Sequence, residues 1–212
     1  MPETDATIDP ANPVAALCAE GMRAEAEGRP GDARALFGRA WDAAADDYEA
    51  CLAAHYVARH QTTPADRLRW NAECLDRADR VGDDRVRAFY PSLHLNLARA
   101  HADLGDPDAA RDHYRRAAGR LDALPPGPYR DWVVYAVAAG LREPGPDPVR
   151  DLIDRLCDRR AHGPLALLLP RHAAAPLAAD RTDLVTALRM VHASPDLDDR
   201  TRDLVRAALA AG

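Results

Sequence analysis

The stretch that decides the fold is Asn96 to Ala117, which reads NLARAHADLGDPDAARDHYRRA. Apolar residues recur at helical spacing before its centre, and Gly105 stands where a helix C-terminus favours a residue that tolerates a left-handed backbone. Asp106 can then accept hydrogen bonds from the free N–H groups of a new helix, and Pro107 fills the first helical position, where its missing N–H costs nothing. Adjoining stop and start signals of this kind predict two antiparallel helices, a helical hairpin.

Small residues in both helices predict how this hairpin packs. Ala98 in the first helix and Ala110 and Ala117 in the second let the two backbones approach closely, while Tyr114 fills the space beside them. The closest approach is expected at Ala110, so a larger side chain there would overpack the hairpin.

The same residues resemble a tetratricopeptide repeat, a helical hairpin of about 34 residues. On a frame that begins at Pro91, the preferred residue types of that family are met by Asn96, Leu97, Ala98, Gly105, Asp106, Ala110, Tyr114 and Ala117. Residues 14–47 resemble the family again through Gly21, Gly28, Ala33, Phe37 and Ala40. The resemblance implies an α-solenoid scaffold that binds proteins or peptides and has no chemistry of its own.

Start and stop signals along the rest of the chain predict an all-α fold, an α-α superhelix of TPR-like hairpins with a helical C-terminal cap. We expect residues 1–11 to form a disordered leader and residues 12–124 to form three hairpins. Residues 125–212 are expected to hold a degenerate fourth hairpin and a helical C-terminal region. The C-terminal helices lack the Gly and Ala spacing of the repeat, so we expect them to cover the apolar end of the solenoid.

The second and third hairpins are expected to depart from the regular repeat in detail. The loop of the second is longer than the usual turn, and Thr63 is expected to cap the helix that follows it. The second helix of the third hairpin is expected to continue to about Leu124, before a Pro-rich boundary. The second helix of the second hairpin is expected to have one apolar face, which consists of Leu68, Ala72, Leu75 and Ala78.

Composition favours helix and disfavours several classes of partner. Of the 212 residues, 47% are hydrophobic but only two are Phe, so the core is expected to consist mainly of Ala, Leu and Val. All 28 basic residues are arginine, which indicates a GC-rich genome. The net charge is −6, and acidic and basic residues are interspersed along the chain without a basic stripe, so no nucleic acid is expected as a partner.

The longest apolar run, Trp132 to Ala139, is too short for a membrane span, so we expect a cytoplasmic protein.

No cofactor, metal ion or catalytic residue is expected. Cys51 and His55 share a helix face, but no further Cys or His cluster would complete a metal site around them. The Asp and His residues between His101 and His113 are expected to cap and solvate a helical turn. Four scattered cysteines are expected to be reduced, buried thiols: Cys18, Cys51, Cys74 and Cys157.

Polar residues on the first helix of each hairpin are the candidates for binding, because that helix lines the concave face of a solenoid. We predict a partner-binding site made of His55, Arg59, Ser92, Asn96 and Arg99. The arginines would attract an acidic or carboxylate-bearing segment, Asn96 would orient its main chain, and His55 would add a donor. Binding should then weaken with salt and tighten as the pH falls from about 7.5 to 6. Alternatively, these residues serve only interhelix hydrogen bonds and solvation.

The expected function is that of a cytoplasmic adaptor that binds a protein or peptide on the concave face. One alternative is a small-molecule receptor or enzyme with a pocket around His55, Arg59 and Asn96, closed by the C-terminal helices. Another is a structural homodimer. Trp70, Tyr90 and Trp132 would anchor an interface or, as we expect, fill volume in an Ala-rich core.

Overall fold

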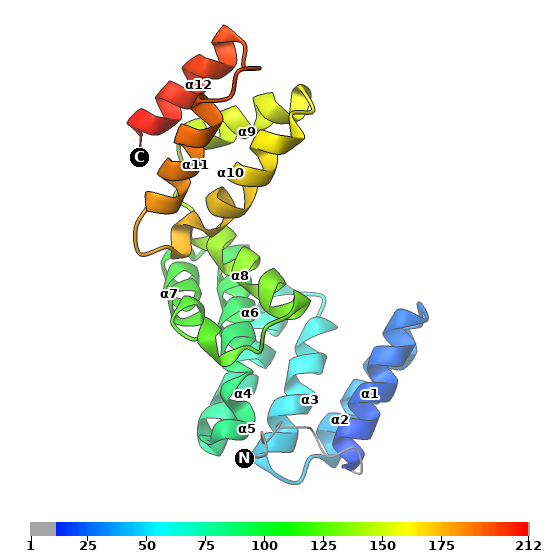
Figure 1. Ribbon diagram of the computed structural model, residues 1–212. Helices are drawn as coiled ribbons and strands as arrows, with labels where there is room; N and C mark the ends of the chain where they lie inside the picture. The colour runs from blue at the N-terminus through cyan, green and yellow to red at the C-terminus, as the bar shows by residue number, and fades with distance from the viewer. Residues whose placement is uncertain (1–11, 212) are drawn as a thin grey trace, which may run out of the picture. The chain divides into compact units, whose positions relative to one another are not determined.

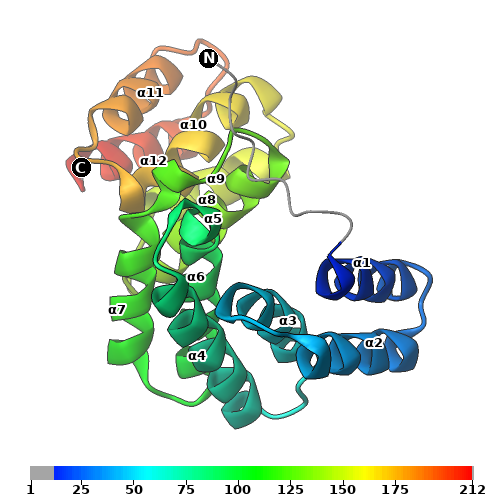
Figure 2. The same cartoon turned by 90° about the horizontal axis from the view of Figure 1, so that it is seen from below.

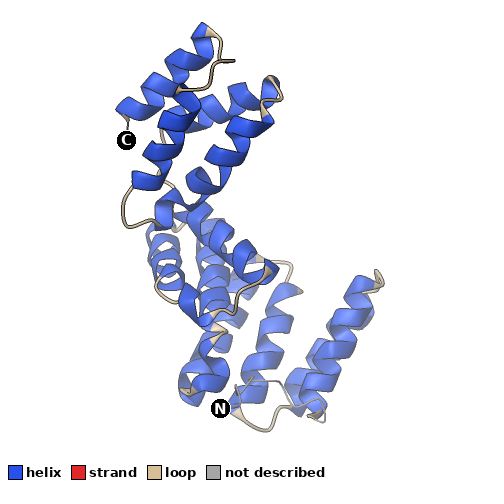
Figure 3. Cartoon of the chain, in the orientation of Figure 1, coloured by secondary structure: helices blue, strands red, loops and turns tan. Residues whose placement is uncertain are grey.

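The computed structural model describes residues 12–211, and all regular structure in that part of the chain is helical, with no strand (Figure 3). The expected leader, residues 1–11, lies outside the described residues. The chain divides into two compact units, one up to Val133 and one from Val134 onward. The helices up to the unit boundary are α1 (Pro13–Ala26), α2 (Pro30–Ala43), α3 (Asp47–Arg59), α4 (Pro64–Val81), α5 (Asp84–Arg87), α6 (Tyr90–Asp103), α7 (Pro107–Ala118) and α8 (Pro128–Leu141), in which the boundary falls.

Three helical hairpins build the first unit. Helices α1 and α2, α3 and α4, and α6 and α7 lie side by side, and the hairpins follow one another through contacts of α2 with α3 and of α4 with α6 (Figures 1 and 2). Helix α3 begins 34 residues after α1, as the repeat requires, whereas α6 begins 43 residues after α3. The extra length lies in the long helix α4 and the inserted turn α5. The expected all-α helical-repeat fold is confirmed.

The turn of the third hairpin is closed by the stop and start signals of the sequence. Gly105 has a φ of +76°, and the N–H of Asp106 donates to the carbonyl oxygen of His101 at 3.0 Å. The side chain of Asp106 accepts a hydrogen bond from the N–H of Ala109 at 3.1 Å, and Pro107 is the first residue of α7. The predicted hairpin is confirmed.

The first hairpin uses the same turn and a close contact between its helices. The N–H of Arg29 donates to the carbonyl oxygen of Ala24 at 2.8 Å, with Gly28 at a φ of +73°. A Cβ atom at Gly21 would lie 2.3 Å from the ring of Phe37, which is fully buried. Only glycine therefore lets α1 approach α2 this closely.

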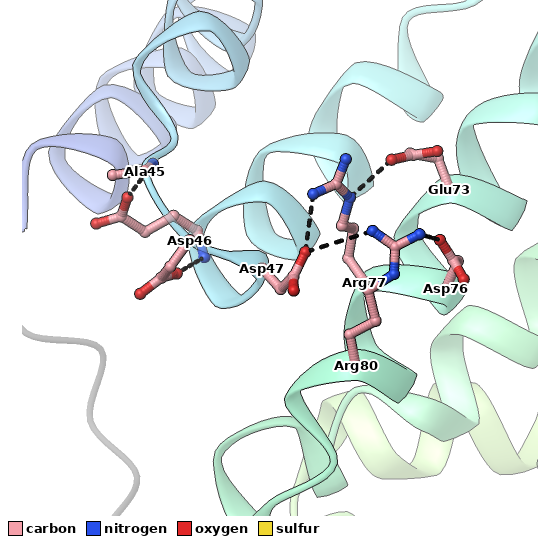
Figure 4. Close-up of polar contacts among 8 residues, drawn as sticks. Ala45, Asp46, Asp47, Glu73, Asp76, Arg77 and Arg80 are labelled. Carbon is pink, nitrogen blue, oxygen red and sulfur yellow. Dashed lines mark hydrogen bonds and ion pairs between the residues drawn. The ribbon is translucent and has the colours of Figure 1, made fainter.

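Capping and ion pairs fix the start of α3 against α4 (Figure 4). The carboxylate of Asp46 accepts a hydrogen bond from the N–H of Glu49 at 2.8 Å, and the carboxylate of Glu49 accepts one from the N–H of Ala45 at 2.7 Å. Asp47 pairs with the guanidinium of Arg77 on α4 at 2.8 Å. These contacts orient the second hairpin, although exposed pairs of this kind add little stability.

Two helix details differ from the prediction. On α4 the buried residues include Asn71 and Cys74, whereas Ala72 is exposed. The helix face that packs against its neighbours is therefore rotated by about one residue from the predicted face. Helix α7 ends at Ala118 instead of continuing toward Leu124. A single 3₁₀ turn follows, and Leu124 is buried directly after it.

The second unit is helical and has a hydrophobic core of its own. Its helices after α8 are α9 (Pro148–Asp158), α10 (His162–Ala174), α11 (Thr182–His192) and α12 (Asp199–Ala210). Leu152, Leu168 and Leu188 are among the buried residues of that core. Cys157 on α9 is exposed, which corrects the expectation of a buried thiol; the other three cysteines are buried. That these helices cover the end of the solenoid remains a prediction.

Replacing Gly105 with alanine should destabilise the first unit by about 1 kcal/mol, because a Cβ atom is strained in the left-handed backbone. Urea denaturation monitored by circular dichroism measures this change. The matched control is Gly38→Ala within α2, where an added Cβ would contact nothing within 4 Å, so the same substitution should be neutral or stabilising. Equal destabilisation by both variants would contradict the role assigned to the turn.

Candidate functional site

The five residues of the predicted site line two different cavities of the first unit. An apolar cavity of about 290 Å³ is lined by His55, Ser92 and mostly apolar residues of α3, α6 and the start of α8. A polar cavity of about 220 Å³ is lined by Arg59, Asn96 and Arg99, together with residues of α4. The structure therefore separates the predicted residues into one group of two and one group of three.

The polar cavity holds three guanidinium groups and one carboxylate, so its lining is positively charged. Arg59 on α3 pairs with Glu25 of α1 at 2.9 Å, and Arg67 on α4 pairs with Asp103 of α6 at 2.6 Å. Arg99 on α6 has no ion pair within the described part of the chain. Its guanidinium carbon lies 5.0 Å from the ring centroid of Trp132 on α8, a cation–π contact that leaves its donors open to an anion.

A buried amide in the wall of the polar cavity has an unused acceptor. Asn71 is only 5% exposed, and its side-chain Nδ2 donates to the carbonyl oxygen of Arg67 at 2.9 Å. Its Oδ1 atom has no hydrogen-bond partner among the described residues. Buried polar atoms are normally paired, so Oδ1 is suited to accept a hydrogen bond from a ligand N–H.

Three residues of the polar cavity escaped the sequence prediction, namely Arg67, Asn71 and Asp103. Two of them lie on α4, the second helix of its hairpin, whereas only first helices were considered. Asn71 did carry a signal, because it is a polar residue inside the helical stripe of Leu68 and Leu75. Such an interruption of an apolar stripe could have identified it.

The two predicted residues in the apolar cavity differ in their hydrogen bonding. The hydroxyl of Ser92 donates to the carbonyl oxygen of Phe89, the residue before α6, at 2.8 Å, so its hydrogen bond is made locally. Burial and then the charge of Arg59 lower the pKa of His55 to about 4. His55 thus stays neutral between pH 7.5 and 6 and does not supply the charge from which tighter binding over that range was expected.

The three aromatic residues noted in the sequence have different environments. Trp70 packs edge-on against Trp41 at a centroid distance of 4.9 Å, and both border a buried cluster. The hydroxyl of Tyr90 donates to Asp79 at 2.8 Å. Trp132 is 47% exposed, so the expectation that it fills the core is wrong, and it lies beneath Arg99 instead.

A second group of titratable side chains joins α6 to α7 outside both cavities. The Nδ1 atoms of His94 and His113 lie 3.1 Å apart, and the ring of His101 stacks on that of His113. Burial, followed by the charges of His113 and of Arg120 and Arg116, lowers the pKa of His94 to about 4. In the described part of the chain, no group of three or more His, Cys, Asp or Glu residues is gathered so that it could hold a metal ion.

Comparison with known proteins identifies the third hairpin. Residues 91–116 match the family model of the tetratricopeptide repeat, so the repeat expected from the sequence is confirmed there. No curated protein and no solved structure matches the chain significantly. Within the described residues, none of the helices combines the length and the apolar character needed to cross a membrane.

The free energy of unfolding should decrease as the pH falls from about 6.5 to 4. In that window the unfolded chain binds a proton at His94, while the folded chain, with the pKa lowered to about 4, does not. The full decrease in the free energy of unfolding from His94 amounts to on the order of 3 kcal/mol. His55, whose pKa is lowered as well, acts in the same direction.

Denaturation midpoints measured at several pH values test this expectation. The variant His94→Gln should flatten the pH dependence, because it removes one titrating group. The exposed His162 of the second unit provides the control variant, His162→Gln. An unchanged pH dependence in the His94 variant would disprove the assignment.

Proposed function

We propose that the chain binds an acidic, extended segment of a partner protein in the polar cavity, as a cytoplasmic adaptor. The tetratricopeptide repeat and the helical-repeat fold support a scaffold for protein interaction. The observation that carries the proposal is the unpaired Oδ1 of buried Asn71 beside an excess of guanidinium groups. An acceptor of N–H groups and a surplus of positive charge together suit a peptide that bears a carboxylate.

Each polar residue has a distinct part in this proposal. Asn71 accepts a main-chain N–H of the peptide, and Asn96, which lines the same cavity, offers a second amide. Arg99 forms a charge-assisted hydrogen bond with the carboxylate, because its own carboxylate partners are absent within the described residues. Arg59 and Arg67 are already paired and mainly raise the local potential.

A small-molecule receptor with several tuned histidines is less well supported. His55 is the only histidine of the apolar cavity, as far as the described residues show. His94 and His113, whose pKa values are also lowered, line neither cavity. Their pKa values are lowered mainly by burial between α6 and α7, apart from the cavity that holds His55.

Selection from a displayed library of random heptapeptides tests the proposal. We expect the selected peptides to contain Asp or Glu and their affinity to fall as the salt concentration rises. The double variant Arg59→Ala with Arg99→Ala should lower the affinity at least about tenfold, because it removes two of the three guanidinium groups.

The control is the double variant Arg39→Ala with Arg115→Ala, which changes the net charge equally at exposed positions outside the cavity. It should bind the selected peptides almost as well as the unchanged protein. Selected peptides without acidic residues, or equal losses in both double variants, would rule the polar cavity out as the binding site.

A further inference from the structure

We infer that the bound segment carries a large apolar side chain, best an aromatic one, two residues away from its acidic residue, and that this side chain fills the apolar cavity. The inference rests on the proposed function and adds a sequence rule for the partner. It depends on how the two cavities are placed along the same helices.

The two cavities follow one another along α3 and α6. On α3, His55 lines the apolar cavity and Arg59 lines the polar one. On α6 the corresponding pair is Ser92 and Asn96. Four residues of an α-helix advance about 6 Å along the axis. On both helices the step from one cavity to the next is therefore about one helical turn.

The start of α8 reaches the apolar cavity and one arginine of the polar cavity, and α4 shows the order of the two cavities on a third helix. Tyr129 lines the apolar cavity, and Trp132, three residues later, lies beneath the guanidinium of Arg99 from the polar cavity. On α3 and α6 the residues at the apolar cavity precede those at the polar cavity. On α4, which runs antiparallel to α3, the order is reversed as it should be: Arg67 and Asn71 line the polar cavity and Cys74 lines the apolar one. The agreement of three separate helices makes the two cavities neighbouring parts of one elongated site.

An extended peptide matches this spacing with side chains two residues apart. Successive residues of an extended chain advance about 3.3 Å and point to opposite sides, so residues i and i+2 share a side at about 6.6 Å. A neighbour at i+1 points away from the site, and a residue at i+4, at about 13 Å, lies beyond the second cavity. Only a spacing of two fits a carboxylate in one cavity and a side chain in the other.

The lining of the apolar cavity selects the side chain. Leu52, Phe89, Leu93 and Tyr129 provide aliphatic and aromatic surface, and a volume of about 290 Å³ suits one large side chain. The neutral ring of His55 has no hydrogen-bond partner among the described residues and brings no charge into the cavity. A charged side chain would lose its hydration there without gaining an ion pair, whereas an aromatic one would be buried favourably.

A series of synthetic heptapeptides with one Glu and one Phe in an alanine and serine background tests the rule. The Phe is placed one, two or three residues before or after the Glu, and the reference peptide has Ala in its place. Fluorescence anisotropy should show affinity at least about tenfold above the reference for one of the two peptides with a spacing of two. The peptides with a spacing of one should bind like the reference.

Filling the apolar cavity should remove this gain and nothing else. Ala88 lines the cavity, so Ala88→Leu should abolish the advantage of the Phe peptide while the salt-dependent binding of the reference peptide persists. The control is Ala72→Leu on the exposed side of α4. If Ala88→Leu fails to fold, the peptide series on the unchanged protein decides the question alone.

The two hypotheses fail in different ways. If the Glu-containing peptides bind with salt dependence but none gains from Phe at a spacing of two, the sequence rule is wrong and the proposed acidic site stands. A gain at every spacing would equally refute the rule, because it would show non-specific apolar attraction. If no acidic peptide binds, the proposed function fails and the rule fails with it.

Discussion

The tight turn within each regular hairpin is the constraint on which the rest of the first unit depends. A left-handed glycine ends one helix and a proline begins the next two residues later, as at Gly28 with Pro30 and at Gly105 with Pro107. The two helices of each such hairpin must then run antiparallel. On α3 and α6, residues one turn apart line the apolar and the polar cavity in the same order.

The alanine-rich core leaves room for the polar side chains of the polar cavity. Small side chains such as Ala58 and Ala100 let the helices approach closely and leave room at the cavity wall for long arginine side chains. Burying Asn71 with an unpaired oxygen costs roughly 1–3 kcal/mol, which a purely structural hairpin would avoid with an apolar residue. An unpaired buried acceptor next to three guanidinium groups is typical of a binding site in which the ligand donates the missing hydrogen bond.

The elements that could be predicted from the sequence are those fixed by neighbouring residues. The start of α7 at Pro107, and that of α4 at Pro64 directly after the cap Thr63, follow from local capping and proline geometry and were predicted to the residue. Contacts between distant residues were not accessible, such as the pairing of Arg59 with Glu25 in another helix. For the same reason the split of the site into two cavities and the lowered pKa of His55 could not be foreseen, since both depend on packing between helices.

The charged groups at the polar cavity and the histidines with lowered pKa values have different roles. The first should affect binding of a partner, and the second should affect stability. The positive groups at the polar cavity are guanidinium groups, which stay charged over the whole physiological range, and His55 in the adjoining cavity is neutral there. His94 and His113, whose pKa values are also lowered by burial, lie in the contact of α6 with α7 and line neither cavity. Ionic strength should therefore govern the binding of an acidic segment, while pH should act mainly on the stability of the first unit, through the buried His55 and His94.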